Sequence, residues 1–146
     1  MTDAVIEVRA LDVADYEAIC AVWEASGVHL QLTGRESREA FTRQMDGGTQ
    51  TVLGAFEGDK LVGVALITHD GRKGWINRLG VLPDQQRKGI GTILVQTAET
   101  LIHDMGLTIV AALVEHHNEA SLKMFQRAGY QVNATYYLTK RDRSDA

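Results

Sequence analysis

The sequence predicts a mixed α/β domain built on a mostly antiparallel sheet that contains one parallel pair of strands. Three strand-like segments follow one another through short polar turns, which is typical of an antiparallel meander. A helical segment separates the last of them from a continuous apolar run, so these two strands are expected to be parallel. The 146 residues, 45% of them hydrophobic, suffice for a single domain that spans residues 1–146.

The first half of the chain is expected to form one strand followed by two helices. Apolar and polar residues alternate in the strand, and Asp12, with Asp15 three residues later, is a helix N-cap signal. The expected elements lie at residues 5–9, 13–25 and 37–46. The connection between the helices lacks a pattern, and such loops often bind ligands. Its candidates for the rim of a substrate site are His29, Gln31, Thr33 and Arg35.

The second half is expected to form three strands, a helix, a strand, a helix and a last strand. The first helix carries an inward stripe of apolar residues from Ile90 to Ile102. The strand after it is a continuous apolar run, which suits a buried position. Asn118 is expected to cap the last helix and Gly129 to end it. The expected elements lie at residues 51–56, 60–68, 74–82, 89–105, 108–114, 118–128 and 132–139.

Charge and composition disfavour several classes of protein. The formal net charge of −4 argues against a general nucleic-acid binder, which usually shows a basic excess. No apolar run approaches a membrane span, and the N-terminus carries Asp3 and Glu7 instead of a basic leader. The one cysteine, Cys20, cannot form an internal disulfide and is read as buried filler in a reducing compartment. We therefore expect a cytoplasmic protein without a metal site.

Residues 86–92, Gln-Arg-Lys-Gly-Ile-Gly-Thr, place two glycines where a strand is followed by a helix. A helix N-terminus carries unpaired N–H groups and a partial positive charge, and glycines let an anion approach them closely. Arg87 and Lys88 add charge at the same point. The segment lacks the full dinucleotide-binding and P-loop patterns. It predicts an anion site, and the alternative interpretation is an ordinary strand-to-helix turn with a basic rim.

Two motifs make the chain resemble the GCN5-related N-acetyltransferase (GNAT) superfamily. The family's acetyl-CoA signature, Gln or Arg, two residues, Gly, one residue, then Gly or Ala, is met by Gln86, Gly89 and Gly91. An Asn, a short helix and a closing Gly-aromatic pair form the second motif, which is met by Asn118 and Gly129-Tyr130. The resemblance covers nearly the whole chain. It implies a mixed, mostly antiparallel sheet of six to seven strands, with a parallel central pair and helices on both faces.

The resemblance also implies that acetyl-CoA is the co-substrate. The amides of residues 87–92 would hold its pyrophosphate, and a bulge would splay the preceding strand so that its backbone pairs with the pantetheine amides. Gly80 is either a bulge residue or a packing requirement, and Asn118 either a pantetheine ligand or a cap alone. The implied cofactor-binding residues are Leu79, Gly80, Val81, Gln86, Arg87, Lys88, Gly89, Ile90, Gly91, Thr92, Asn118 and Phe125.

The chain departs from the family at its catalytic groups. Many members have a Tyr, able to protonate the departing thiolate, where this chain has Phe125; Tyr136 and Tyr137 are substitutes, or ordinary strand residues. Many members also have a carboxylate on the strand before the loop, and residues 75–78 of this chain include none. Strand alternation would place only one of Asn77 and Arg78 on the site face. Arg78 would favour a substrate that bears a carboxylate.

A general base must take a proton from an ammonium substrate before it attacks the thioester. Residues 115–117, which follow the parallel strand, are the first candidates, and exposed loop residues are the alternative interpretation. His69 and Asp70 are a second choice, although residues 69–75 also read as a charged hairpin turn. The candidate catalytic residues are Glu115, His117, Asn77 and Tyr136.

These features predict an N-acetyltransferase that moves the acetyl group of acetyl-CoA to a primary amine of a small molecule, or of a protein or peptide, in a ternary complex. The alternative, motivated by Phe125 and the missing carboxylate, is a non-catalytic acetyl-CoA-binding sensor or regulatory protein. Transfer of a longer acyl group is a third interpretation. Neither nucleic acid nor membrane is an expected partner. A homodimer is expected by analogy with relatives that pair or swap their last strands.

Overall fold

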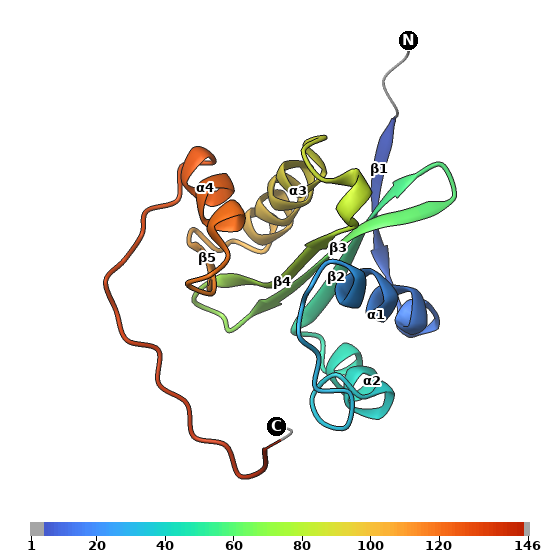
Figure 1. Cartoon of the computed structure of the whole chain (residues 1–146). Helices are drawn as coiled ribbons and strands as arrows, with labels where there is room; N and C mark the ends of the chain where they lie inside the picture. The colour runs from blue at the N-terminus through green and yellow to red at the C-terminus, as the bar shows by residue number, and fades with distance from the viewer. Residues whose placement is uncertain (1–4, 145–146) are drawn as a thin grey trace.

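The computed structural model describes residues 5–144 and shows a five-stranded sheet with two helices against each face (Figure 1). The strands are β1 (Ile6–Leu11), β2 (Gln50–Glu57), β3 (Lys60–His69), β4 (Gly74–Val81) and β5 (Val110–Ala112). The helices are α1 (Tyr16–Ala25), α2 (Arg38–Asp46), α3 (Ile90–Asp104) and α4 (Glu119–Arg127). Two short 3₁₀ helices are η1 (Val13–Asp15) and η2 (Pro83–Gln85).

The strands lie side by side in chain order, from β1 to β5. The first four pair antiparallel, and β5 pairs parallel with β4 over three residues, from Gly74–Val110 to Ile76–Ala112. The parallel pair follows from its connection through α3, because a helical crossover returns the chain in the same direction. The predicted meander and parallel pair are confirmed.

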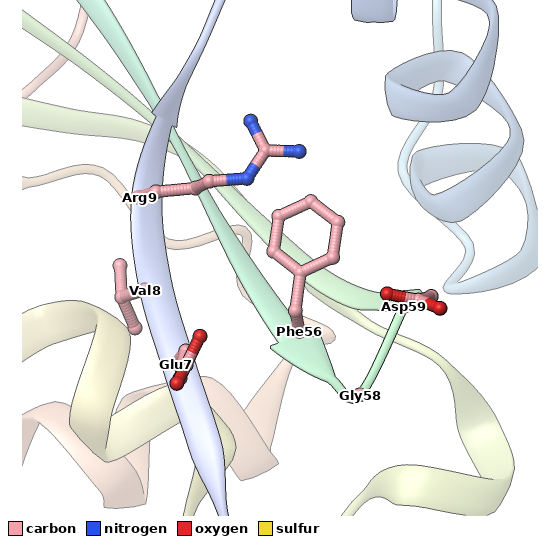
Figure 2. Close-up of a pocket in the computed structure, with 6 residues that line it drawn as sticks. All are labelled: Glu7, Val8, Arg9, Phe56, Gly58 and Asp59. Carbon is pink, nitrogen blue, oxygen red and sulfur yellow. The ribbon is translucent and has the colours of Figure 1, made fainter.

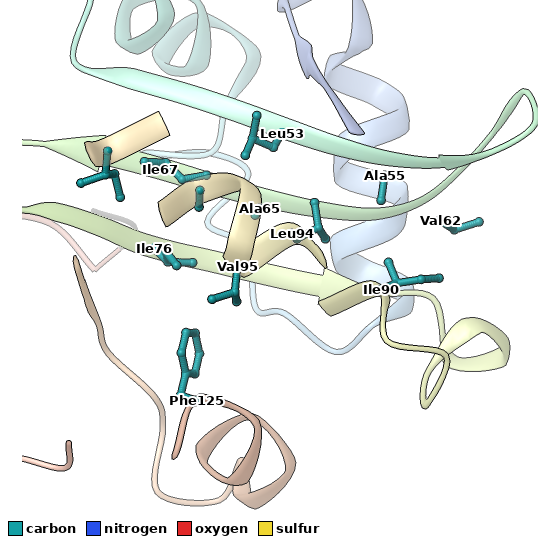
Figure 3. Close-up of a cluster of buried hydrophobic side chains, with 12 residues drawn as sticks. Leu53, Ala55, Val62, Ala65, Ile67, Ile76, Ile90, Leu94, Val95 and Phe125 are labelled. Atoms are coloured by element: carbon teal, nitrogen blue, oxygen red, sulfur yellow. The ribbon is translucent and has the colours of Figure 1, made fainter. Parts of the chain in front are cut away.

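Each face of the sheet has its own hydrophobic core. On one face, α3 and α4 cover the inward side chains of β2, β3 and β4 (Figure 3). On the other face, Trp23 of α1 and Phe41 of α2 pack with Val52 and Val64. Burying such a side chain contributes about 1.5–3 kcal/mol. The apolar stripe of α3 is buried as its spacing predicts, at Ile90, Leu94, Val95, Ala98 and Ile102.

The starts and ends of the helices are the best-predicted local features. Asp12 and Asp15 form a capping box at η1. The first turn of the expected 13–25 helix is this 3₁₀ helix. Ser37 accepts a hydrogen bond from the Ala40 amide (3.1 Å), which begins α2. Gly129 ends α4 with a φ of +98°, a left-handed conformation that glycine adopts at little cost.

The last two predicted strands are where the sequence-based prediction was wrong. β5 has three half-buried residues instead of a buried run from 108 to 114. Residues 132–139 form no strand, and Tyr136 and Leu138 are 96% and 86% exposed in the segment that follows α4 (Figure 1). The described sheet therefore has five strands rather than six or seven. Strand propensity needs a partner edge, and β5 offers a very short one.

Candidate active site

Strands β4 and β5 diverge beyond the carboxyl end of β5. Their pairing stops at Ile76, whereas β4 continues to Val81. Asn77 is an extra residue in β4, because Leu66 of β3 pairs with Arg78 and the next residue pairs with Ile76. This bulge reverses the side to which the following backbone groups point. Among residues 5–144, no strand covers the β5 side of β4 beyond Ile76.

The backbone of β4 presents hydrogen-bonding groups along this open edge. The Leu82 amide donates to the Val62 carbonyl on β3 (2.9 Å), and alternate residues of a strand point the same way. The backbone groups of Leu79 and Val81 therefore face away from β3. Such an edge is a template for an extended ligand that contains amides. Gln86 donates from Nε2 to the Val81 carbonyl (3.1 Å), which ties the following loop to the strand.

The N-terminus of α3 adjoins this edge and fits an anion. Its N-cap is Gly89, with a φ of +81°; no side chain caps the helix, and its first turn has no acidic residue. Arg87 has a φ of +67°, the one positive value for a non-glycine residue in the described chain. Lys88 donates from Nζ to Oε1 of the buried Gln85 (3.1 Å). Uncapped amides beside two cations can hold a phosphate group.

Gly80 of β4 allows the C-terminal end of α1 to approach the strand closely. A Cβ atom at Gly80 would overlap the Ser26 side chain and lie 3.2 Å from Cδ1 of Trp23. Gly80 also pairs in regular register with Val64, so its packing interpretation is confirmed and the bulge lies at Asn77 instead.

The loop between α1 and α2 carries a buried carboxylate, which the sequence analysis missed. Glu36 is 9% exposed. Its Oε1 accepts hydrogen bonds from Nη2 of Arg78 (2.6 Å) and Nε of Arg35 (3.0 Å), and its Oε2 accepts one from the Gln31 amide (2.8 Å). The Tyr16 hydroxyl donates to the Glu36 carbonyl. The loop is thereby fastened to both α1 and β4.

The bulge also changes which side chains face this loop. Asn77 donates from Nδ2 to Oγ1 of Thr68 (2.6 Å). Thr68 lies on the face of the sheet that α1 covers, the face to which Val64 also points. Arg78 reaches the α1–α2 loop on that same face. The expectation that only one of Asn77 and Arg78 would face this side was wrong, because an extra residue interrupts strand alternation.

The other candidate catalytic residues are exposed. Glu115 and His117 lie in a turn directly after β5, closed by a hydrogen bond from the Asn118 amide to the Glu115 carbonyl (2.9 Å). They stand on the β5 side of the divergence, whereas Asn77 stands on the β4 side. Tyr136 lies on the C-terminal segment, which joins no strand in the described chain.

Asp70 shapes the β3–β4 turn. Hydrogen bonds from the backbone amides of Lys73 and Arg72, and from the indole of Trp75, lower its pKa to about 2. A carboxylate with so low a pKa is a weak proton acceptor at neutral pH. The geometry therefore favours the interpretation of a charged hairpin turn over that of a general base.

The second motif forms α4 and its end. The Asn118 side chain accepts from the Ser121 amide (3.2 Å), so it caps the helix. Phe125 is 6% exposed and meets the Tyr130 ring edge-on, with the ring centroids 5.0 Å apart. The Tyr130 hydroxyl donates to Oε2 of Glu99 (2.8 Å). Burial, and then this bond, raise the pKa of Tyr130, which keeps the hydroxyl protonated.

Other features of the molecule lie apart from this region. One pocket lies at the opposite edge of the sheet, where the Arg9 guanidinium stacks 4.3 Å from the Phe56 ring centroid (Figure 2). Burial raises the pKa of the Cys20 thiol, which disfavours a nucleophilic role.

Within residues 5–144, no three His, Cys, Asp or Glu side chains are grouped to hold a metal ion. None of the described helices is long and apolar enough to cross a membrane.

An uncapped helix N-terminus beside an open strand edge fits an extended ligand that carries a phosphate group. Comparisons with known proteins identify the class of protein. The model of the acetyltransferase (GNAT) family matches residues 12–130. The chain therefore belongs to the GNAT family, and it is an acyl-CoA N-acyltransferase.

Individual relatives and solved structures agree with this membership. Acetyltransferase YE1169 of Yersinia enterocolitica is 25% identical over 138 residues, which cover 93% of this chain and 95% of that protein. The PaiA N-acetyltransferase of Thermoplasma acidophilum, solved with coenzyme A, has a TM-score of 0.81 at 22% identity, over 90% of this chain and 93% of that one. Aminoglycoside N-acetyltransferase AAC(6')-Iy, solved with CoA, has a TM-score of 0.77 at 12% identity, over 97% and 98%. These structures share the fold.

Proposed function

We propose that this chain transfers the acetyl group of acetyl-CoA to a primary amine, of a small molecule or of a protein or peptide, by direct attack in a ternary complex. The observation that supports this most is the uncapped N-terminus of α3 beside the open edge of β4. The first suits a pyrophosphate, and the second suits an arm that contains amides. Coenzyme A has both.

Acetyl-CoA is the co-substrate, and it supplies an acetyl group activated as a thioester. In the proposed site, the amides from Arg87 to Thr92 hold the pyrophosphate, while Arg87 and Lys88 add positive charge. The outward backbone groups of Leu79 and Val81 pair with the pantetheine amides. A backbone N–H on this edge also stabilises the negative charge that develops on the thioester oxygen, a contribution of a few kcal/mol.

The reaction forms a C–N bond, breaks the C–S bond and releases the CoA thiol. We assign proton removal from the amine to Glu115 or His117, and orientation of the amine to Asn77, because these residues flank the diverging strands. Phe125 has no proton to give and lies in the core. The leaving thiolate takes its proton from water or from Tyr136, and the latter requires residues 132–139 to fold back against the sheet.

The C-terminal segment supports a homodimer. Its exposed apolar residues lack a partner among the described residues, and Ile109 and Leu113, which flank β5, are 50% and 53% exposed. If residues 132–139 of one copy paired with β5 of another, the apolar residues of the segment and those that flank β5 would both be buried. Truncation after Tyr130 is expected to convert the dimer to a monomer in analytical ultracentrifugation.

The single cysteine supports a cytoplasmic location.

Calorimetric titration with acetyl-CoA tests the donor site. Gly89→Glu introduces a negative side chain at the α3 N-terminus, and a loss of affinity of about tenfold or more is expected. Gly106→Glu is the matched control, because Gly106 has a φ of +85° after the other end of α3 and open space around it. Equal binding by the two folded variants would contradict the proposed pyrophosphate site. Release of CoA in the presence of a panel of amines then tests the transfer.

A further inference from the structure

The side chains of Arg35, Glu36 and Arg78, here called the Glu36 cluster, carry excess positive charge. Both guanidinium groups share one carboxylate oxygen, at 2.6 and 3.0 Å. The Gln31 amide binds the other oxygen, so one negative charge faces two positive ones. A third guanidinium, of Arg38, lies 5.3 Å from the ring centroid of Tyr16, whose hydroxyl donates to Glu36. A chain with a net charge of −4 thus has a basic site at this point.

The Glu36 cluster lies next to the proposed position of the thioester. Arg78 directly precedes Leu79 in β4, and consecutive Cα atoms are about 3.8 Å apart. Its side chain extends on the sheet face covered by α1 and α2, whereas α3 and the proposed pyrophosphate site lie on the other face. A second substrate that approaches the open edge from the α1 and α2 face therefore meets Arg78.

The guanidinium groups of the cluster retain hydrogen-bonding capacity. A guanidinium has five N–H donors, and within residues 5–144 the structure gives the Arg78 and Arg35 side chains one hydrogen bond each. Their side chains are 22% and 45% exposed. Glu36 is buried and holds Arg78 in place, which lowers the entropic cost of binding a second carboxylate.

We propose that the acceptor amine carries a carboxylate, which Arg78 binds with help from Arg35. The inference rests on the proposed acetyl transfer and names its acceptor class: amino acids and related amino carboxylates rather than polycationic amines. The carboxylate fits the planar fork of an arginine through charge-assisted hydrogen bonds. Polycationic amines would be repelled by the same positive charge.

Matched sets of acceptors test this proposal on the full chain. Tyrosine, phenylalanine, methionine and lysine are each assayed for CoA release beside the corresponding carboxamide and decarboxylated amine. The amide has a more acidic ammonium group than the amino acid and the decarboxylated amine a less acidic one, so a preference for the acid over both cannot come from amine basicity. For at least one set, a kcat/KM about 10–100-fold higher for the acid is expected.

Variants assign that preference to the arginines. Arg78→Met and the more exposed Arg35→Met should each reduce it at least fivefold while acetyl-CoA affinity is kept. Arg43→Met is the matched control, because Arg43 is 68% exposed and pairs only with the exposed Glu39 among the described residues. It should leave the preference unchanged.

The outcomes separate this inference from the proposed function. If the protein binds acetyl-CoA but, in every set, turns over the carboxamide or the decarboxylated amine at least as efficiently as the acid, the proposed acceptor class is overturned. Acetyl-CoA binding with no turnover of any amino acid tested would overturn it too. So would a preference for the acid that survives in both Arg78→Met and Arg35→Met. Absence of acetyl-CoA binding in the same preparation would instead overturn the proposed function itself.

Discussion

The two sides of the open β4 edge are built in different ways. On the α3 side, one run of consecutive residues, 86–92, provides the helix N-terminus, the left-handed backbone positions and the cations. On the α1 and α2 side, the Glu36 cluster joins residues 42 positions apart in the sequence. Backbone chemistry therefore dominates the first region, and long-range side-chain pairing dominates the second.

This difference has a consequence for how the regions respond to mutation. A site made of backbone amides tolerates changes in distant side chains, whereas a buried ion pair fails when either partner is removed. We expect the two regions to be separable, so that one can be damaged while the other keeps its function.

The largest effect on stability is expected from Glu36→Gln. Removing the negative charge leaves Arg78 partly buried beside a neutral amide, at a cost of about 3 kcal/mol in the free energy of unfolding. Glu39→Gln, at an 87% exposed side chain, should cost less than about 0.5 kcal/mol. Urea denaturation measures both. Loss of acetyl-CoA binding by a folded Glu36→Gln protein would show that the two regions are not separable.

A smaller loss is expected from Gly80→Ala. The added Cβ overlaps the Ser26 side chain, and overpacking of this kind costs about 1–3 kcal/mol. Ser26→Ala removes the nearest atom, so the double variant should regain part of the stability lost in the single one. Strictly additive effects in thermal unfolding would argue against the packing account of Gly80.

Tyr130→Phe should cost about 1–2 kcal/mol, because it removes the hydrogen bond to Glu99 and keeps the ring contact with Phe125. Tyr136→Phe removes the same hydroxyl from a residue that is 96% exposed and should leave the unfolding midpoint unchanged. An equal effect of the two substitutions would refute the role given to the Tyr130 hydroxyl in fastening the end of α4 to α3.

The last effect is confined to high pH and concerns Tyr16 and the α1–α2 loop. Burial chiefly, and then its hydrogen bond with Cys20, raise the pKa of Tyr16 from 10.0 to about 12. The unfolded chain loses this proton at lower pH than the folded one, so the contribution is fully present below pH 10 and is lost as the pH rises to about 12. The stability difference between the parent and Tyr16→Phe, measured by urea denaturation, should shrink across that window. A constant difference would contradict the raised pKa.

Local patterns in the sequence were sufficient for most of the fold. The capping box at Asp12, the helix start at Ser37, the apolar stripe of α3 and the glycine-containing segment 86–92 are all features of neighbouring residues, and the structure shows each where it is expected. The last strand could not be predicted in this way, because its formation depends on whether β5 offers an edge long enough to pair with.

The side chains at the candidate site were harder to predict. Nothing near Asn77 in the sequence signals a bulge, since the register mismatch arises only when β4 meets β3. Glu36 lies in an unpatterned loop, and its burial depends on Arg78 and Tyr16 from other elements. The one signal available was that the strand before the glycine loop carries an arginine, Arg78, whose charge invites a search for a carboxylate partner.

Hydrogen exchange with and without acetyl-CoA tests the central claim most directly. The account predicts slower exchange, on addition of acetyl-CoA, in peptides that cover Leu79 to Val81 and Gly89 to Thr92, with little change in residues 28–36. Protection confined to residues 28–36, or none at the start of α3, would contradict the assignment of the donor site to the α3 side of the open edge.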